Sequence, residues 1–108
     1  MKNRIVSYNL IKKSAKKVAE KLHPQKIILF GSYSYGKPSK DSDVDLLFIF
    51  SKPLNTSHTY AEISKILEPR EFPIDIMIRS TKQIQSRLKI GDNFIQDILK
   101  TGKILYGS

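Results

Sequence analysis

Two short apolar runs constrain the fold of this 108-residue chain more than any other feature of its sequence. Residues 27–30 are apolar throughout, and residues 44–50 are apolar except for Asp45. Neither run shows the strict polar and apolar alternation of a strand with one face in water, so each predicts a strand that is buried on both faces. We therefore expect a sheet with helices packed against it.

Helical spacing, alternation and turn residues predict the remaining elements. The first half of the chain is expected to form a helix over 5–22, which His23 and Pro24 end, and strands over 27–30 and 44–50. A loop over 54–58, a helix over 59–67 and a strand over 74–78 follow. A capping box of Ser80 and Gln83 then opens a helix that Gly91 ends, and the chain closes with a helix around 94–99, which stops near Gly102, and an edge strand over 104–106. We see no repeat and no linker. The sequence thus predicts one α/β (α+β) domain over residues 1–108, with a small mixed sheet.

Composition and charge exclude several classes of protein. The absence of cysteine excludes a disulfide scaffold, a thiolate metal site and a cysteine nucleophile. No apolar run approaches the ~18 residues that span a bilayer, and no export signal is visible, so we expect a cytoplasmic protein. The net charge is +9, and the first thirty residues hold eight basic residues against Glu20 alone. This distribution fits a small acidic site in a basic body that attracts phosphates or an acidic partner, although lysines also simply keep small domains in solution.

Asp43 and Asp45 form the first half of a candidate metal site. The two-residue period of a strand places both carboxylates on one face, with α-carbons ~6.6 Å apart. Two unpaired carboxylates on one face raise each other's pKa, so they call for a counter-charge such as Mg²⁺. Asp75, on another predicted strand, completes a site for two cations if its strand neighbours the first, and would then lie near the attacking hydroxyl. Alternatively, these residues are ordinary turn and exposed-strand aspartates.

Gly31 and Ser32 follow the first buried strand directly. Glycine adopts backbone angles that other residues find strained, and exposed amides with a hydroxyl can hold a triphosphate, especially if a helix begins there. Ten residues separate this pair from Asp43.

The pattern of Gly-Ser, ten residues and Asp-x-Asp, followed by an apolar strand and a later isolated aspartate, resembles the nucleotidyltransferase fold of the DNA polymerase beta superfamily. It is most similar to the minimal nucleotidyltransferases, which are often encoded beside a helical HEPN-domain toxin. The resemblance covers about residues 5–106. It implies that Gly31 and Ser32 bind the nucleotide phosphates, and that Asp43, Asp45 and Asp75 bind two Mg²⁺ ions and form the catalytic triad.

The resemblance also implies an activity and a partner. Family members with this spacing transfer AMP from ATP to a tyrosine of the HEPN toxin and thereby act as antitoxins. The oligomeric state stays open, with a homo- or a hetero-oligomer as the alternatives. Two positions depart from the family pattern, since many relatives have Ala in place of Ser34 and Arg in place of Tyr35. The lost Arg removes a phosphate contact that Lys37 or Lys40 could replace.

Several alternatives stay open on the sequence alone. Tyr33 and Tyr35 either stack on a base or pack beneath the loop. The lysines of the first helix are either a solvated face or a contact for an acidic partner. Sequence-specific nucleic-acid binding is not expected, because no recognition motif for it is present. The protein is either a Mg²⁺-dependent nucleotidyltransferase or a non-catalytic antitoxin that neutralises its partner by contact.

Overall fold

The computed structural model describes residues 5–36, 38–39 and 41–107. The elements are α1 (Tyr8–Leu22), β1 (Lys26–Phe30), a short 3₁₀ helix η1 (Gly31–Tyr33), β2 (Val44–Phe50), α2 (Thr56–Ile66), β3 (Ile74–Ser80), α3 (Thr81–Lys89), α4 (Asn93–Thr101) and β4 (Lys103–Tyr106). None of the helices in this described part combines the length and the apolar character that a membrane crossing needs.

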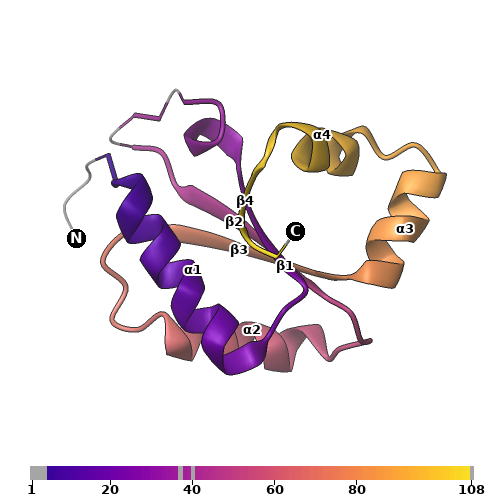
Figure 1. The fold of residues 1–108 in the computed structure, drawn as a ribbon, viewed down its shortest axis with the longest axis horizontal. Coiled ribbons are helices and arrows are strands. Elements are labelled where there is room, and N and C mark those ends of the chain that lie inside the picture. Colours follow the sequence, from indigo (N-terminus) through magenta and orange to yellow (C-terminus); the bar gives the residue numbers. More distant parts are fainter. Residues whose placement is uncertain (1–4, 37, 40, 108) are drawn as a thin grey trace.

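The four strands form one mixed sheet in the order β3-β2-β1-β4 (Figure 1). β1 is antiparallel to both β2 and β4, whereas β2 and β3 are parallel. A parallel pair needs a crossover connection, and α2 provides it between β2 and β3. The expected mixed sheet and the edge position of the last strand are both confirmed.

Helices cover the two faces of the sheet in pairs (Figure 1). Leu46 and Phe48 of β2 belong to the core cluster under α1 and α2, and Leu47 and Ile49 belong to the cluster under α3 and α4. All four side chains are buried. This arrangement confirms that β2 is buried on both faces, and it explains why its sequence lacks alternation.

Two helix starts differ from the sequence prediction because of capping side chains. α1 begins at Tyr8 rather than at residue 5, since the Ser7 side chain accepts a hydrogen bond from the amide of Leu10 and fixes Ser7 as the N-cap. α2 begins at Thr56, so residues 56–58 were wrongly expected to be loop; the Asn55 side chain accepts a hydrogen bond from the amide of His58. The capping box of Ser80 and Gln83 at the start of α3 is confirmed.

Candidate active site

The structure places Asp45 and Asp75 side by side. Asp45 is the second residue of β2, Asp75 is the second residue of β3, and the two are direct partners in the parallel register. Asp45 alternates with Leu47, and Asp75 with Met77, so both lie on the face covered by α3 and α4. The expectation that the strand of Asp75 neighbours that of Asp45 is therefore confirmed.

Asp43 and Gly31 lie at the same end of the sheet. Asp43 is exposed and directly precedes the first residue of β2. β1 runs antiparallel to β2, with Phe30 opposite Asp45, so the chain leaves β1 at Gly31 beside the Asp45 carboxylate. The topology thus gathers residues from three strand ends, of which the outermost in sequence, Gly31 and Asp75, are 44 positions apart.

Gly31 packs directly on Asp45. Its φ of 77° lies in the left-handed region that disfavours other residues, and a Cβ added there would overlap Asp45 Oδ2. Position 31 therefore requires glycine for two reasons: its backbone angle is strained for other residues, and the Asp45 carboxylate occupies the space that a Cβ would need.

Charge repulsion is concentrated at Asp45. Its pKa is raised from 3.8 to about 6, first by burial and then by the negative charges of Asp75 and Asp43. Within the described residues none of the three carboxylates forms an ion pair or hydrogen bond with a side chain. A half-buried carboxylate between two others, with no such partner in this part of the chain, has the donor chemistry that suits a hard divalent cation.

The three carboxylates are not a closed ligand set by themselves. In the part of the chain that the structure describes, no group of three or more His, Cys, Asp or Glu side chains lies close enough together to hold a metal ion alone. A cation at this end of the sheet would need further oxygen ligands from water or from a substrate.

The segment after Gly31 is shorter than an α-helix. Gly31–Tyr33 forms one 3₁₀ turn, in which the Gly31 carbonyl accepts hydrogen bonds from the amides of Ser34 and Tyr35. No α-helix begins there, so a helix dipole does not add to phosphate binding at Ser32, which is half-buried. Lys37 and Lys40, the candidate replacements for the family's Arg, lie outside the described residues.

Both departures from the family pattern contact α4. The Ser34 hydroxyl donates to the carbonyl oxygen of Thr101 at 2.7 Å, and the Tyr35 hydroxyl donates to Asp97 Oδ2 at 2.5 Å. Tyr33 is buried and its hydroxyl accepts a hydrogen bond from the amide of Val6. The interpretation that these tyrosines pack beneath the loop is confirmed for Tyr33 and wrong for Tyr35, which is exposed because its hydroxyl reaches out to α4.

Helix α4 is the part of the site that sequence reasoning missed. A cavity of about 260 Å³ lies between the loop and α4 beside Asp45, and its wall includes Phe94, Asp97 and Thr101 of that helix. The ring of Phe94 meets that of Phe30 edge-on, with centroids 6.0 Å apart. These residues carry no motif, and their amphipathic spacing indicates only a helix that packs on a sheet.

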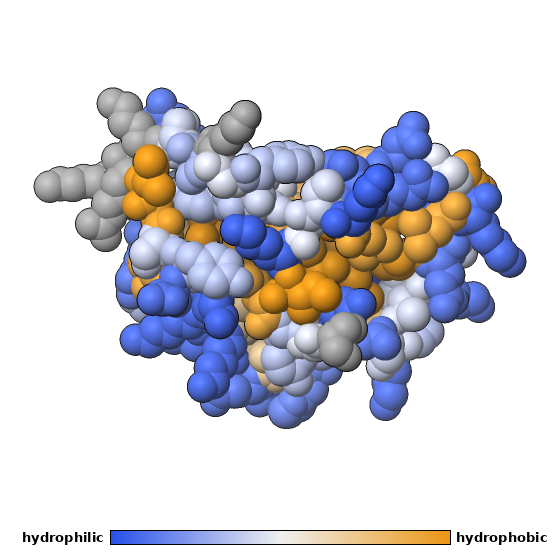
Figure 2. Space-filling view, turned by 45° about the horizontal axis from the view of Figure 1, so that its top comes forward, coloured by the Kyte–Doolittle hydropathy of each residue, from blue (hydrophilic) through white to orange (hydrophobic). Residues whose placement is uncertain are grey.

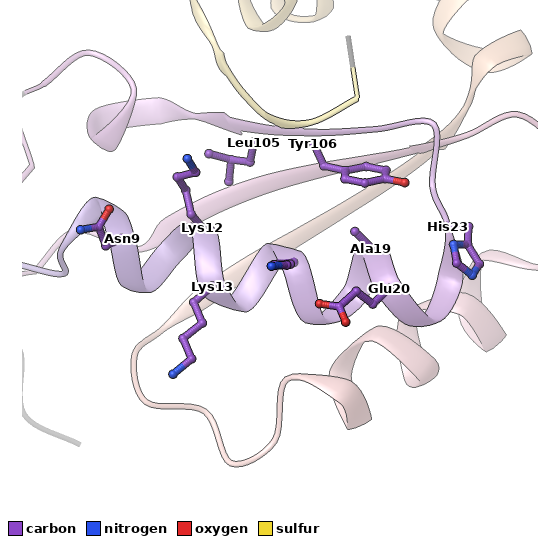
Figure 3. A pocket seen from close by; sticks show the side chains of 9 residues that line it. Asn9, Lys12, Lys13, Ala19, Glu20, His23, Leu105 and Tyr106 are labelled. Atoms are coloured by element: carbon purple, nitrogen blue, oxygen red, sulfur yellow. The ribbon is translucent and has the colours of Figure 1, made fainter.

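A hollow larger than the one beside Asp45 lies elsewhere in the described molecule. A cavity of about 660 Å³ between α1 and β4 is lined by Lys12, Lys13 and Lys16 on the helix and by Leu105 and Tyr106 on the strand (Figure 3). None of the three site carboxylates lines it. Volume alone would thus have pointed away from the acidic end of the sheet.

Comparisons with known proteins point to one family. The sequence model of the nucleotidyltransferase domain matches residues 11–105. A protein of Methanocaldococcus jannaschii that bears the provisional name of a protein adenylyltransferase is 29% identical over 82 residues, which span 76% of this chain and 78% of that protein.

Solved structures share the same fold. A toxin–antitoxin structure with AMP-PNP matches 90% of this chain and 73% of its own, with a TM-score of 0.65 and 22% identity. A complex of tri-AMPylated Shewanella oneidensis HEPN toxin with MNT antitoxin matches 93% and 72%, with a TM-score of 0.60 and 20% identity. A Sulfolobus solfataricus structure, provisionally named a nucleotidyltransferase, matches 92% and 78%, with a TM-score of 0.63 and 20% identity. The expected fold is confirmed.

Proposed function

Because this chain belongs to the nucleotidyltransferase domain family, and is by that membership a nucleotidyltransferase, we propose that it transfers AMP from ATP to a hydroxyl group of a protein partner with the help of Mg²⁺. The pairing of Asp45 with Asp75 across β2 and β3, beside Gly31, carries this proposal. The M. jannaschii relative supports the same reaction class through its name.

We assign metal binding to Asp43, Asp45 and Asp75. Their oxygen donors and the charge repulsion at Asp45 fit one or two Mg²⁺ ions whose remaining ligands are water and phosphate oxygens. Bound Mg²⁺ would neutralise the charge that develops on the phosphate oxygens during transfer. The three carboxylates themselves orient the reactants, and one of them accepts the proton of the acceptor hydroxyl.

The reaction makes and breaks one bond to phosphorus. The acceptor oxygen attacks the α-phosphorus of ATP, the bond from that phosphorus to the bridging oxygen breaks, and pyrophosphate leaves. Asp75 is exposed at the edge strand β3 and is the carboxylate we assign to the acceptor hydroxyl, whose proton it orients and accepts. Gly31 and Ser32, on the other side of Asp45, hold the phosphates.

A HEPN-type helical protein is the partner we infer, and the protein acts on it as an antitoxin. The fold is that of the antitoxin in the complex with tri-AMPylated HEPN toxin. Lys12, Lys13 and Lys16 of α1 line the large hollow beside β4 together with Glu20, and in the described residues no ion pair engages these lysines. An acidic face of the HEPN-type partner would complement this surface (Figure 3).

Both core clusters flank one sheet, which supports a single nucleotidyltransferase domain over residues 1–108. The small cavity beside Asp45 has room for part of a nucleotide but not for a folded acceptor.

Intact-mass spectrometry tests the proposal. Incubation with the HEPN-type partner, ATP and Mg²⁺ should add the mass of AMP to the partner, and Asp75→Ala should abolish the addition while the two proteins still bind. Glu71→Ala, at an exposed carboxylate outside β3, is the matched control and should leave the addition intact. If wild type and Asp75→Ala silence the partner equally and neither changes its mass with any nucleoside triphosphate, the protein works by contact alone.

A further inference from the structure

Three consecutive side chains tie the loop after Gly31 to distant parts of the chain. Tyr33 bonds to the backbone of Val6, 27 positions away. Ser34 bonds to α4 at Thr101, 67 positions away, and Tyr35 bonds to α4 at Asp97, 62 positions away. Figure 1 shows the loop at the end of the sheet, between the start of α1 and α4. Loops are usually more mobile than the elements they connect, so three such anchors restrain this one.

We propose that Ser34 and Tyr35 are positioning residues that use α4 as a clamp to set where Gly31 and Ser32 stand relative to Asp45. This proposal rests on the proposed nucleotide site. α4 packs on the sheet through Ile95 and Ile98, which are both buried in one cluster with Ile28 of β1 and Leu47 of β2. The helix is therefore a fixed reference for the loop.

The connection from α4 to Asp45 runs through a series of direct contacts. The amides of Ser34 and Tyr35, whose side chains are held by α4, both bond to the Gly31 carbonyl at 2.9 and 3.2 Å. Gly31 in turn lies so close to Asp45 that a Cβ would overlap its carboxylate. A loop free to swing would change that contact. The bonds of Ser34 and Tyr35 hold the turn on the side of α4, and the bond between Tyr33 and Val6 holds it on the side of α1.

The two clamping bonds differ in exposure. Ser34 is buried, so its bond to Thr101 is shielded from water, whereas Tyr35 and Asp97 are exposed. Removal of the Tyr35 hydroxyl alone deletes the bond to Asp97 and leaves the buried packing in place. Tyr35→Phe is therefore the cleanest variant, with Ser34→Ala as the second.

The reason for an effect on binding is entropic. A clamped loop meets the nucleotide phosphates already ordered, and a released loop must lose its freedom on binding. Removal of the clamp should thus act mainly on affinity. A residue needed only for stability would change the melting temperature and leave the affinity of the folded protein unchanged.

Titration calorimetry with Mg²⁺ and AMP-PNP tests the clamp without any partner protein. We expect Tyr35→Phe and Asp97→Ala each to weaken binding about five- to tenfold, and the double variant to be no weaker than either, because each single change already deletes the same bond. In the transfer reaction the same variants should raise KM for ATP by a similar factor and change kcat less than threefold. Tyr60→Phe, at an exposed tyrosine of α2 on the opposite face, is the control and should change neither.

Hydrogen exchange of the nucleotide-free protein separates this inference from the proposed function. The amides of Ser34 and Tyr35 should exchange at least tenfold faster in Tyr35→Phe than in wild type, at equal melting temperature. If wild type binds no nucleotide, the proposed function fails, and faster exchange in the variant still supports the clamp. The clamp would be overturned if the two amides exchanged equally fast in Tyr35→Phe and in wild type. It would also be overturned if wild type bound the nucleotide and Tyr35→Phe bound it with the same affinity.

Discussion

Asp45 and Asp75 stand directly opposite each other on the parallel strands β2 and β3, with Asp43 two residues before the first of them. Like charges opposite each other on neighbouring strands destabilise a sheet. The fold nonetheless concentrates them at one half-buried end, where Gly31 closes over Asp45. Such a cluster of carboxylates destabilises the free protein and is stabilised when a cation binds. This behaviour is expected of a functional site.

The raised pKa of Asp45 predicts a pH-dependent stability of the metal-free protein. The pKa is about 6 in the folded state and 3.8 in the reference state, so folding favours the protonated carboxyl. The contribution of Asp45 to the stability of the folded protein is therefore fully present below pH 4 and is lost as the pH rises through about 6. Asp45→Asn should therefore stabilise the free protein at pH 8, by about 1 kcal/mol once solvent screening is allowed for.

Thermal melts at pH 5 and pH 8 measure this effect. The melting temperature of Asp45→Asn should exceed that of wild type by several degrees at pH 8 and by less at pH 5. Glu71→Gln, at an exposed position, is the control for charge removal in general. Equal melting temperatures of wild type and Asp45→Asn at pH 8 would contradict the repulsion.

Mg²⁺ together with AMP-PNP should reverse the order of stability. A ligand that binds only the folded state adds about 2.7 kcal/mol at a hundredfold excess over Kd. Wild type should gain this stabilisation, whereas the double variant Asp43→Asn with Asp45→Asn should gain almost none. Differential scanning fluorimetry with Mg²⁺ alone, nucleotide alone and both together checks the prediction, and an undiminished shift in the double variant would remove these residues from the metal site.

Two glycines allow backbone strain to be separated from steric overlap. Gly31 and Gly36 have nearly equal φ values, 77° and 75°, but a Cβ meets Asp45 at the first and open space at the second. Gly36→Ala should cost about 1 kcal/mol of stability through strain alone. Gly31→Ala should cost about 1–3 kcal/mol more, because the methyl group displaces the carboxylate, and should abolish transfer. Chemical denaturation measures both, and equal losses in the two variants would show that the contact with Asp45 is unimportant.

The sequence predicted those parts of the protein that are encoded by local pattern. β2 was placed at its observed bounds because seven nearly apolar residues lie between polar turns, and the box of Ser80 and Gln83 marked the start of α3. Asp75 could be tied to Asp45 only conditionally. Strand adjacency is set by how helices cover a sheet, which no local pattern encodes.

The contribution of α4 to the site could not be predicted. The bonds from Ser34 and Tyr35 to α4 span more than sixty positions and involve common polar residues without a spacing rule. The short 3₁₀ turn at Gly31 was also beyond reach, since glycine and serine permit a turn or a helix start equally well. Tertiary packing decided between them.

The basic hollow between α1 and β4 predicts how the HEPN-type partner binds. Reversal of Lys12, Lys13 and Lys16 to Glu should weaken the complex at least tenfold, because it replaces attraction to an acidic face with repulsion. Binding of the wild type should weaken between 50 and about 500 mM salt, whereas the reversed variant should be nearly insensitive, since exposed charges are screened within ~10 Å at 0.1 M. Lys65→Glu and Lys89→Glu, at exposed positions on α2 and α3, control for the change in net charge. Surface plasmon resonance across the salt series measures both effects, and undiminished binding by the triple variant would return these lysines to the role of a solvated helix face.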